Sequence, residues 1–98
     1  MIKKTPAKQG ETTKVTFEYP GDMGAREVNL CGEFNDWSSV STPLARRKGG
    51  QFSVSLNFKQ GRSYRFRYLV DGHQWENDPE ADGYEANGYG TEDSVIRL

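Results

Sequence analysis

The segment Gln51–Gly72 reads QFSVSLNFKQGRSYRFRYLVDG and contains the clearest strand pattern in the chain. Apolar residues occupy every second position over 52–58 and again over 64–70. A period of two is typical of half-buried β-strands, which turn alternate side chains to opposite faces. Gln60-Gly61 separates the two strands, and Asp71-Gly72 predicts a hairpin turn after the second. The segment therefore predicts antiparallel β-structure.

Shorter stretches with the same alternation flank this segment. They predict strands over residues 15–19, 28–34, 44–48 and 94–98, with a further short strand around Gln74-Trp75. Residues 1–12 are polar, and we expect a flexible tail there. Residues 76–93 are rich in turn formers and are predicted as loop. About seven short antiparallel strands without helical periodicity predict an all-β sandwich, formed by one domain over residues 13–98.

The composition limits the classes of function. The 98 residues fit one domain, and the aromatic share of 12% argues against disorder. A formal charge of -1 gives no overall field that favours nucleic acid or an anionic membrane, so we expect neither as a partner. Neither a transmembrane run nor a signal peptide is evident, and Cys31 is the single cysteine. We therefore expect a cytoplasmic, reducing location.

Residues that usually carry chemistry are few and scattered. His73 is the single histidine and lies beside a turn, so the sequence supports neither a zinc set nor a catalytic triad. Cys31 lies in an apolar strand, which favours a buried, inert thiol. Residues 78–83 begin like a calcium loop, but Tyr89 stands where the twelfth-position Glu is needed, so we interpret them as a solvated acidic loop. No spacing pairs two carboxylates for glycosidic cleavage. We predict no catalytic residue, no metal and no cofactor.

Charge is segregated along the sequence. Residues 38–70 carry seven basic and no acidic side chains, whereas residues 76–93 carry seven acidic and no basic ones. The two blocks either neutralise each other across the sandwich or line a charged groove. Binding of nucleic acid by the basic block is a further alternative, and it would show a steep dependence on salt.

The two tryptophans, Trp37 and Trp75, lie in or next to predicted loops among polar neighbours. Tryptophan in a small sandwich usually belongs to the core. A ring among polar neighbours also suits a ligand with a flat apolar face. A pyranose has such a face, while its hydroxyls are bound edge-on by planar polar groups such as Asn, Asp and Arg.

Four segments, in this order, resemble a known family: VNLCGEFNDW (28–37), YRFRYLVDG (64–72), WENDP (75–79) and GTEDSVI (90–96). Over about residues 13–98 the chain resembles the early-set glycan-binding modules of carbohydrate-binding module family 48, found in isoamylases and glycogen branching enzymes. It is also similar to the glycogen-binding domain of the β subunits of AMP-activated protein kinase. The resemblance implies an immunoglobulin-like β-sandwich. It also implies non-catalytic binding of α-1,4-linked glucan, namely glycogen, starch or a malto-oligosaccharide, on a shallow surface.

The resemblance further implies a glycan site of six residues: Trp37, Arg67, Trp75, Tyr89, Thr91 and Asp93. The two tryptophans would stack on glucose units, and Arg67 would hydrogen-bond their hydroxyls. Asp93 replaces an amide of the family and so lacks its two N–H donors. Tyr89 replaces an aliphatic residue and would either add a third stacking surface or alter the fit of the ligand. His73 is an extra residue before Trp75 that would alter the orientation of the indole ring.

No catalytic barrel follows, so the hydrolase and transferase activities of the family are not expected here. We expect a stand-alone module that serves a glucan-metabolising enzyme or another protein. Besides nucleic-acid binding, two alternatives stay open. The chain is a protein–protein interaction or adaptor module without sugar binding, or it is an accessory domain related to family 13 glycoside hydrolases with residual hydrolysis.

Overall fold

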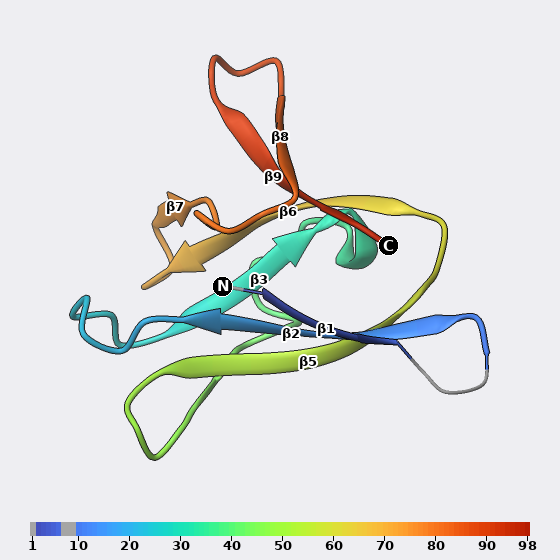
Figure 1. Cartoon of the computed structure of the whole chain (residues 1–98). Helices are drawn as coiled ribbons and strands as arrows, with labels where there is room; N and C mark the ends of the chain where they lie inside the picture. The colour runs from blue at the N-terminus through green and yellow to red at the C-terminus, as the bar shows by residue number, and fades with distance from the viewer. Residues whose placement is uncertain (1, 7–9) are drawn as a thin grey trace.

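The computed structural model describes residues 2–6 and 10–98. The chain forms two antiparallel sheets that stack face to face (Figure 1). The first sheet has the order β1 (Ile2–Pro6), β2 (Thr12–Tyr19), β5 (Phe52–Lys59) and β4 (Ala45–Arg46). The second has the order β3 (Val28–Gly32), β6 (Ser63–Val70), β9 (Glu92–Arg97) and β8 (Gly83–Ala86), and β7 (Gln74–Glu76) also pairs with β6. A short 3-10 helix, η1 (Glu33–Asn35), follows β3. The predicted all-β sandwich is confirmed.

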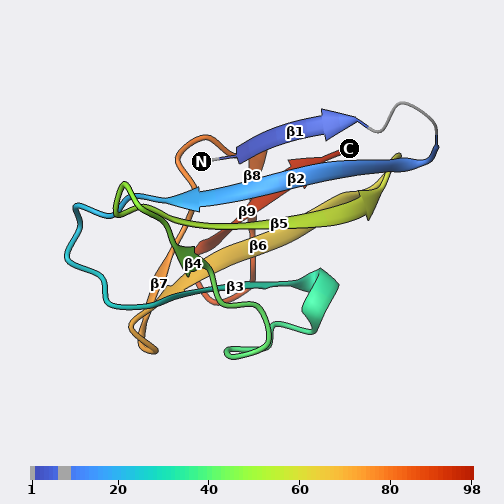
Figure 2. The same cartoon turned by 90° about the horizontal axis from the view of Figure 1, so that it is seen from below.

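The core lies between the two sheets and is rich in aromatic rings. Phe17 of β2 and Phe66 of β6 are both fully buried, and their ring centroids lie 5.2 Å apart in an edge-to-face arrangement. The strands of the two layers run in roughly the same direction, as in aligned sandwiches (Figure 2). Because the even-numbered residues of β6 point into the core, Arg65, Arg67 and Leu69 lie on the outer face of the second sheet.

The predicted flexible tail over residues 1–12 is wrong for residues 2–6. These residues form β1, whose register along β2 runs from Ile2 opposite Phe17 to Pro6 opposite Thr13. Ile2 is half-buried and the other four residues are exposed, so the strand has no apolar alternation for the sequence to show. Its backbone pairing with the edge of β2 holds it instead. Residues 1 and 7–9 lie outside the described residues.

The predicted loop over residues 76–93 is also partly wrong. It contains β8, an edge strand whose side chains are mostly exposed and therefore carry no alternating pattern. Asp78, expected in a solvated acidic loop, is fully buried. The strand predicted over 28–34 ends at Gly32, where the chain enters η1. The described residues thus form nine strands rather than about seven. Among them, no helix has the length and apolar character needed to cross a membrane.

The Asp71-Gly72 turn joins β6 to β7 as predicted. Asp71 and Gly72 have φ of 52° and 76°, the positive values that favour Asp and Gly at such a turn. Asp71 also ties this turn to the segment before β3, because its Oδ1 accepts the backbone N–H groups of Glu27 at 3.0 Å and Arg26 at 2.7 Å. These two hydrogen bonds hold the pKa of the Asp71 carboxyl below its ordinary value.

This lowered pKa gives the domain an acid-sensitive contribution to stability. When the folded pKa lies below the unfolded one, the contribution is present above the unfolded pKa and is lost as the pH falls through the folded pKa. We therefore expect the melting temperature to fall as the pH drops below about 4. The fall should be shallower in Asp71→Asn, which keeps the acceptor oxygen but not the charge. Circular dichroism melts of both proteins check this, and equal slopes would contradict it.

Candidate functional site

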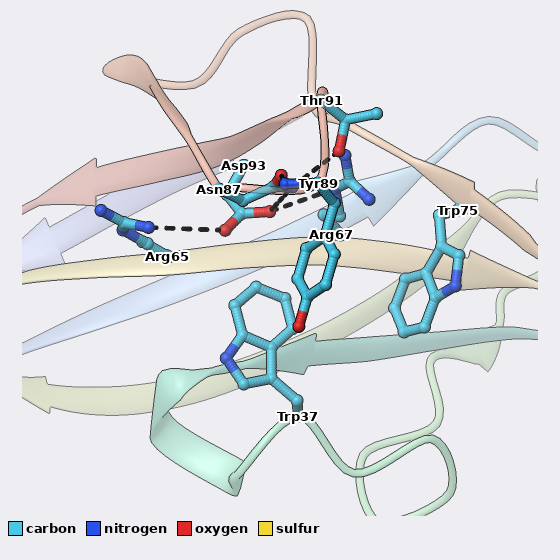
Figure 3. A pocket seen from close by; sticks show the side chains of 8 residues that line it. All are labelled: Trp37, Arg65, Arg67, Trp75, Asn87, Tyr89, Thr91 and Asp93. Carbon is cyan, nitrogen blue, oxygen red and sulfur yellow. Dashed lines mark hydrogen bonds and ion pairs between the residues drawn. The ribbon is translucent and has the colours of Figure 1, made fainter.

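The outer face of the second sheet is hollowed into a cleft of about 550 Å³ (Figure 3). Its lining comprises Trp37, Arg65, Arg67, Trp75, Asn87, Tyr89, Thr91 and Asp93. The six residues that the sequence predicted are therefore all brought to one place, although they come from four separate segments of the chain. Arg65 and Asn87 are additions that the sequence reasoning missed. We call this the tryptophan cleft.

The segment GEFNDW (32–37) places Trp37 by a set of local contacts. A Cβ on Gly32 would lie 2.6 Å from the carbonyl oxygen of Arg65, so only glycine allows β3 to approach β6 this closely. Phe34 packs its ring 5.2 Å from that of Phe58 and anchors η1 to the core. Asn35 Oδ1 accepts the N–H of Gly32 at 3.0 Å, and Nδ2 donates to the carbonyl of Leu30 at 2.8 Å. These contacts to β6, β3 and the core therefore fix the backbone that leads into Trp37.

Trp37 itself has an uncommon backbone conformation. Asp36 and Trp37 have φ of 55° and 57°, in the left-handed region that bulky residues rarely occupy. Such a conformation costs on the order of 1–3 kcal/mol and persists only where the surroundings enforce it. The Trp37 N–H donates to the carbonyl of Gly32 at 2.8 Å, which closes the turn. The turn directs the half-buried indole over the sheet and into the cleft (Figure 3).

Trp75 reaches the same cleft from β7. It is the register partner of Leu69, and paired residues of antiparallel strands project from the same face. Leu69 and Arg67 also share a face because they are two positions apart. The side chain of Trp75 is 45% exposed, an unusual state for so large an apolar ring. The extra residue His73 is accommodated in the exposed turn, and the ring still lines the cleft.

Arg67 and Asp93 form the polar base of the cleft. Arg67 donates to the carbonyl of Glu92 from Nε at 3.1 Å and from Nη2 at 2.7 Å. Its Nε also lies 3.3 Å from Oδ1 of Asp93, whose side chain is only 8% exposed. A charge-assisted pair of this kind fixes the plane of the guanidinium. Asp93 is thus a buried support for Arg67 in addition to lining the cleft.

Arg65 links the basic and acidic blocks of the sequence. Its Nη2 lies 2.7 Å from Oε2 of Glu85 on β8, and its Nη1 lies 3.9 Å from Oδ2 of Asp93. The blocks therefore neutralise each other here within one sheet, from β6 to β9 and β8, rather than across the sandwich. Arg65 stands two residues before Arg67 on a strand, so the period of two could have identified it as a lining residue. The cleft has paired charges and no strong net field.

Asn87 shapes the loop that presents Tyr89. Its Nδ2 donates to Thr91 Oγ1 at 2.7 Å and to Asp93 Oδ1 at 3.0 Å, while its Oδ1 accepts the N–H of Tyr89 at 3.0 Å. Tyr89 is 90% exposed, and its ring lies between those of Trp37 and Trp75 in Figure 3. No sequence pattern marks Asn87 beyond its position before a loop glycine. The cleft thus has aromatic surfaces from three separate segments.

The single cysteine and the single histidine lie outside the cleft. Cys31 is fully buried, and burial raises the pKa of its thiol to about 11, so it is not a ready nucleophile. His73 is exposed in its turn, where Nδ1 lies 2.9 Å from the carbonyl oxygen of Asp71. Within residues 2–6 and 10–98, no three His, Cys, Asp or Glu side chains gather as metal ligands would. The arrangement can stack flat rings and hydrogen-bond their edges.

Known proteins are similar in sequence to this chain. A family profile described as the glycogen recognition site of AMP-activated protein kinase matches residues 13–97. The chain is 33% identical over 95 residues to 5'-AMP-activated protein kinase subunit beta-1 of Rattus norvegicus. This alignment covers 97% of this chain and 31% of the rat protein. It is 35% identical over 82 residues to the same subunit of Sus scrofa, which covers 84% of this chain and 61% of that sequence.

A shorter similarity, 32% over 60 residues, relates the chain to Cruciform DNA-recognizing protein 1 of Saccharomyces cerevisiae and covers 58% of this chain and 12% of that protein. The chain spans 31% of the length of the rat subunit, so this similarity does not assign the activity of the whole subunit to the chain. The match over residues 13–97 includes both tryptophans and every other residue of the cleft. The chain belongs to the family of the glycogen recognition site of AMP-activated protein kinase.

Proposed function

We propose that the chain binds α-1,4-linked glucan in the tryptophan cleft without chemically changing it. The observation that carries this proposal is the convergence of Trp37, Trp75 and Tyr89 around one open, solvent-accessible cleft. Aromatic rings grouped on an exposed surface typically mark a binding site, and a pyranose offers a flat C–H face of matching size. The family to which the chain belongs supports the same ligand class.

The proposed roles of the residues follow from their positions in the cleft. Trp37 and Trp75 would stack on glucose units of one chain, and Tyr89 would cover the bound glucan from the β8–β9 loop. Arg67, held by Asp93 and the Glu92 carbonyl, would donate to sugar hydroxyls from a guanidinium whose plane is already fixed. Thr91 and Asp93 would complete the polar edge. Because the arginines are paired with carboxylates, binding of a neutral ligand should depend little on salt.

A calorimetric titration with maltoheptaose tests this proposal, with cellobiose as the β-linked control. We expect saturable binding of maltoheptaose alone, with an affinity that changes less than about two-fold between 50 and 500 mM NaCl. A reducing-end assay on glycogen should show no release of sugar. Binding of neither sugar would refute the proposal. Binding of duplex DNA with a steep salt dependence would favour nucleic acid instead.

We further propose that glucan binding attaches a partner to glycogen. The names of the rat and pig relatives are those of subunits of a protein kinase, so these relatives act within an assembly. By this similarity the present domain would act as the part that holds the glucan. The identity of the partner, a glucan-metabolising enzyme or another protein, stays a prediction, as does the cytoplasmic location.

A further inference from the structure

A second hollow, of about 400 Å³, lies next to the tryptophan cleft on the same outer face. Its lining includes Asn29 of β3, Leu69 of β6 and Val40 of the loop that follows Trp37. Leu69 is the register partner of Asn29 on one side and of Trp75 on the other. Paired residues point to the same face, so Asn29, Leu69 and Trp75 form one row across three strands. The hollow therefore adjoins Trp75.

Asn29 carries a buried polar atom that no group in the described part of the chain satisfies. The residue is 8% exposed, and its Oδ1 is buried with no hydrogen-bond partner among the described residues. Most buried polar atoms have a partner, so an unpaired one indicates a missing donor. The terminal torsion of asparagine is broad and roughly two-fold, so the carboxamide can rotate its oxygen toward the hollow. A hydroxyl that enters the hollow would supply the donor.

The walls of the hollow combine the two features that a sugar ring needs. Leu69, Pro43 and Val40 provide apolar surface, and the Val40 side chain is 78% exposed at the rim. Glu27 provides an acceptor for hydroxyl donors, and Asn29 would provide a second once its carboxamide has rotated. The volume falls in the range of roughly 300–1,000 Å³ typical of small-molecule sites. This chemistry suits a neutral, hydroxyl-rich unit.

We propose that this hollow is a further glucosyl subsite, which binds a unit of an α-glucan chain that extends past Trp75. This inference rests on the proposed function, because it requires that the tryptophan cleft hold the same chain. The loop of residues 37–43 contributes Trp37 to the cleft and Val40 to the hollow, so both walls belong to one short segment. A glucan chain that runs along this segment would contact both.

The test compares a short and a long malto-oligosaccharide by calorimetry, using maltotriose and maltoheptaose. In Asn29→Ala we expect the affinity for maltoheptaose to fall about five-fold, the effect of one hydrogen bond, and that for maltotriose to stay unchanged. Val40→Asp, which removes exposed apolar wall and adds charge beside Glu27, should give the same selective loss and does not disturb the core. Asn57→Ala, an exposed asparagine on β5 of the opposite sheet, is the matched control and should change neither affinity.

The outcomes separate this inference from the proposed function. Unchanged maltoheptaose affinity in both variants would overturn the subsite while the tryptophan cleft still binds. Equal losses for both sugars in a folded variant would also overturn it, because they would show an effect on the cleft itself. If Asn29→Ala does not fold, the result with Val40→Asp decides. Absence of all glucan binding in the wild type would refute the proposed function and the subsite together.

Discussion

Trp75→Ala should lower the affinity for maltoheptaose by roughly 30-fold while leaving the domain folded. A sugar stacked on one indole face would remove on the order of 100 Å² of apolar surface from water, which corresponds to about 2 kcal/mol. Each 1.4 kcal/mol is a factor of about ten in affinity. The fold should tolerate the change because the side chain is 45% exposed and lies outside the buried core cluster. Calorimetry with maltoheptaose and a circular dichroism melt measure the two effects.

Two further variants make this result specific to stacking. Trp75→Phe keeps a smaller ring and should retain part of the affinity. Met23→Ala removes an apolar side chain that is 62% exposed and does not line the cleft, so it should leave binding unchanged. If Trp75→Ala binds maltoheptaose as the wild type does, Trp75 is not a stacking residue and the assignment of the cleft is wrong.

Asp78→Ala should have the largest effect on stability, a loss of about 3 kcal/mol. Asp78 is fully buried, its Oδ2 accepts the hydroxyl of Tyr68 at 2.7 Å, and its Oδ1 accepts the N–H of Glu80 at 2.8 Å. Removing the carboxyl leaves both buried or half-buried donors unpaired, and each costs about 1–3 kcal/mol. Burial and the neighbouring Asp78 also raise the pKa of Tyr68 far above its ordinary value, so the phenol stays protonated as a donor.

A chemical denaturation series measures this loss. For a domain of this size, about 3 kcal/mol corresponds to a fall of roughly 15 °C in melting temperature. Tyr68→Phe, which removes only the hydroxyl, should cost less than Asp78→Ala. Glu80→Ala, whose side chain is exposed and whose backbone bond to Asp78 remains, is the matched control and should stay near the wild type. A loss below about 0.5 kcal/mol in Asp78→Ala would show that this network is not important for stability.

The hydrogen bonds around Asp78 also help to position residues of the cleft. Ser94 Oγ accepts the N–H of Asp78 at 2.9 Å and donates to Asn77 Oδ1 at 2.7 Å. Asn77 in turn donates to the carbonyl of Glu92 at 2.8 Å, the same oxygen that Arg67 binds. The segment after Trp75 is thereby tied to the start of β9. Loss of Asp78 should therefore weaken glucan binding as well as folding.

The sequence predicted the parts of the fold that bury one face. In β2, β5 and β6 the alternating apolar side chains enter the core, so their period is visible in the chain. β1 and β8 are edge strands with mostly exposed side chains, and backbone pairing rather than side-chain burial holds them. Asp78 could not be predicted as buried, because its hydrogen-bond partner Tyr68 lies ten residues earlier in the chain, on β6.

The same limit applies to the candidate site. Resemblance named Trp37 and Trp75, but their meeting on one face depends on the left-handed turn at Trp37 and on the pairing of Trp75 with Leu69. Neither can be derived from composition or spacing. The support that Asp93 gives to Arg67 is likewise a property of two neighbouring strands. Tertiary pairing therefore decides whether separate binding residues become one site.

The most direct test of glucan binding in the tryptophan cleft follows the two indole N–H signals in a ¹⁵N-labelled sample by NMR. The chain has two tryptophans, so each of these signals reports one side of the cleft. Titration with maltoheptaose should shift both signals in a saturable way, and 10 mM cellobiose should shift neither. Two indole signals that stay in place up to 10 mM maltoheptaose, in a folded sample, would contradict the account.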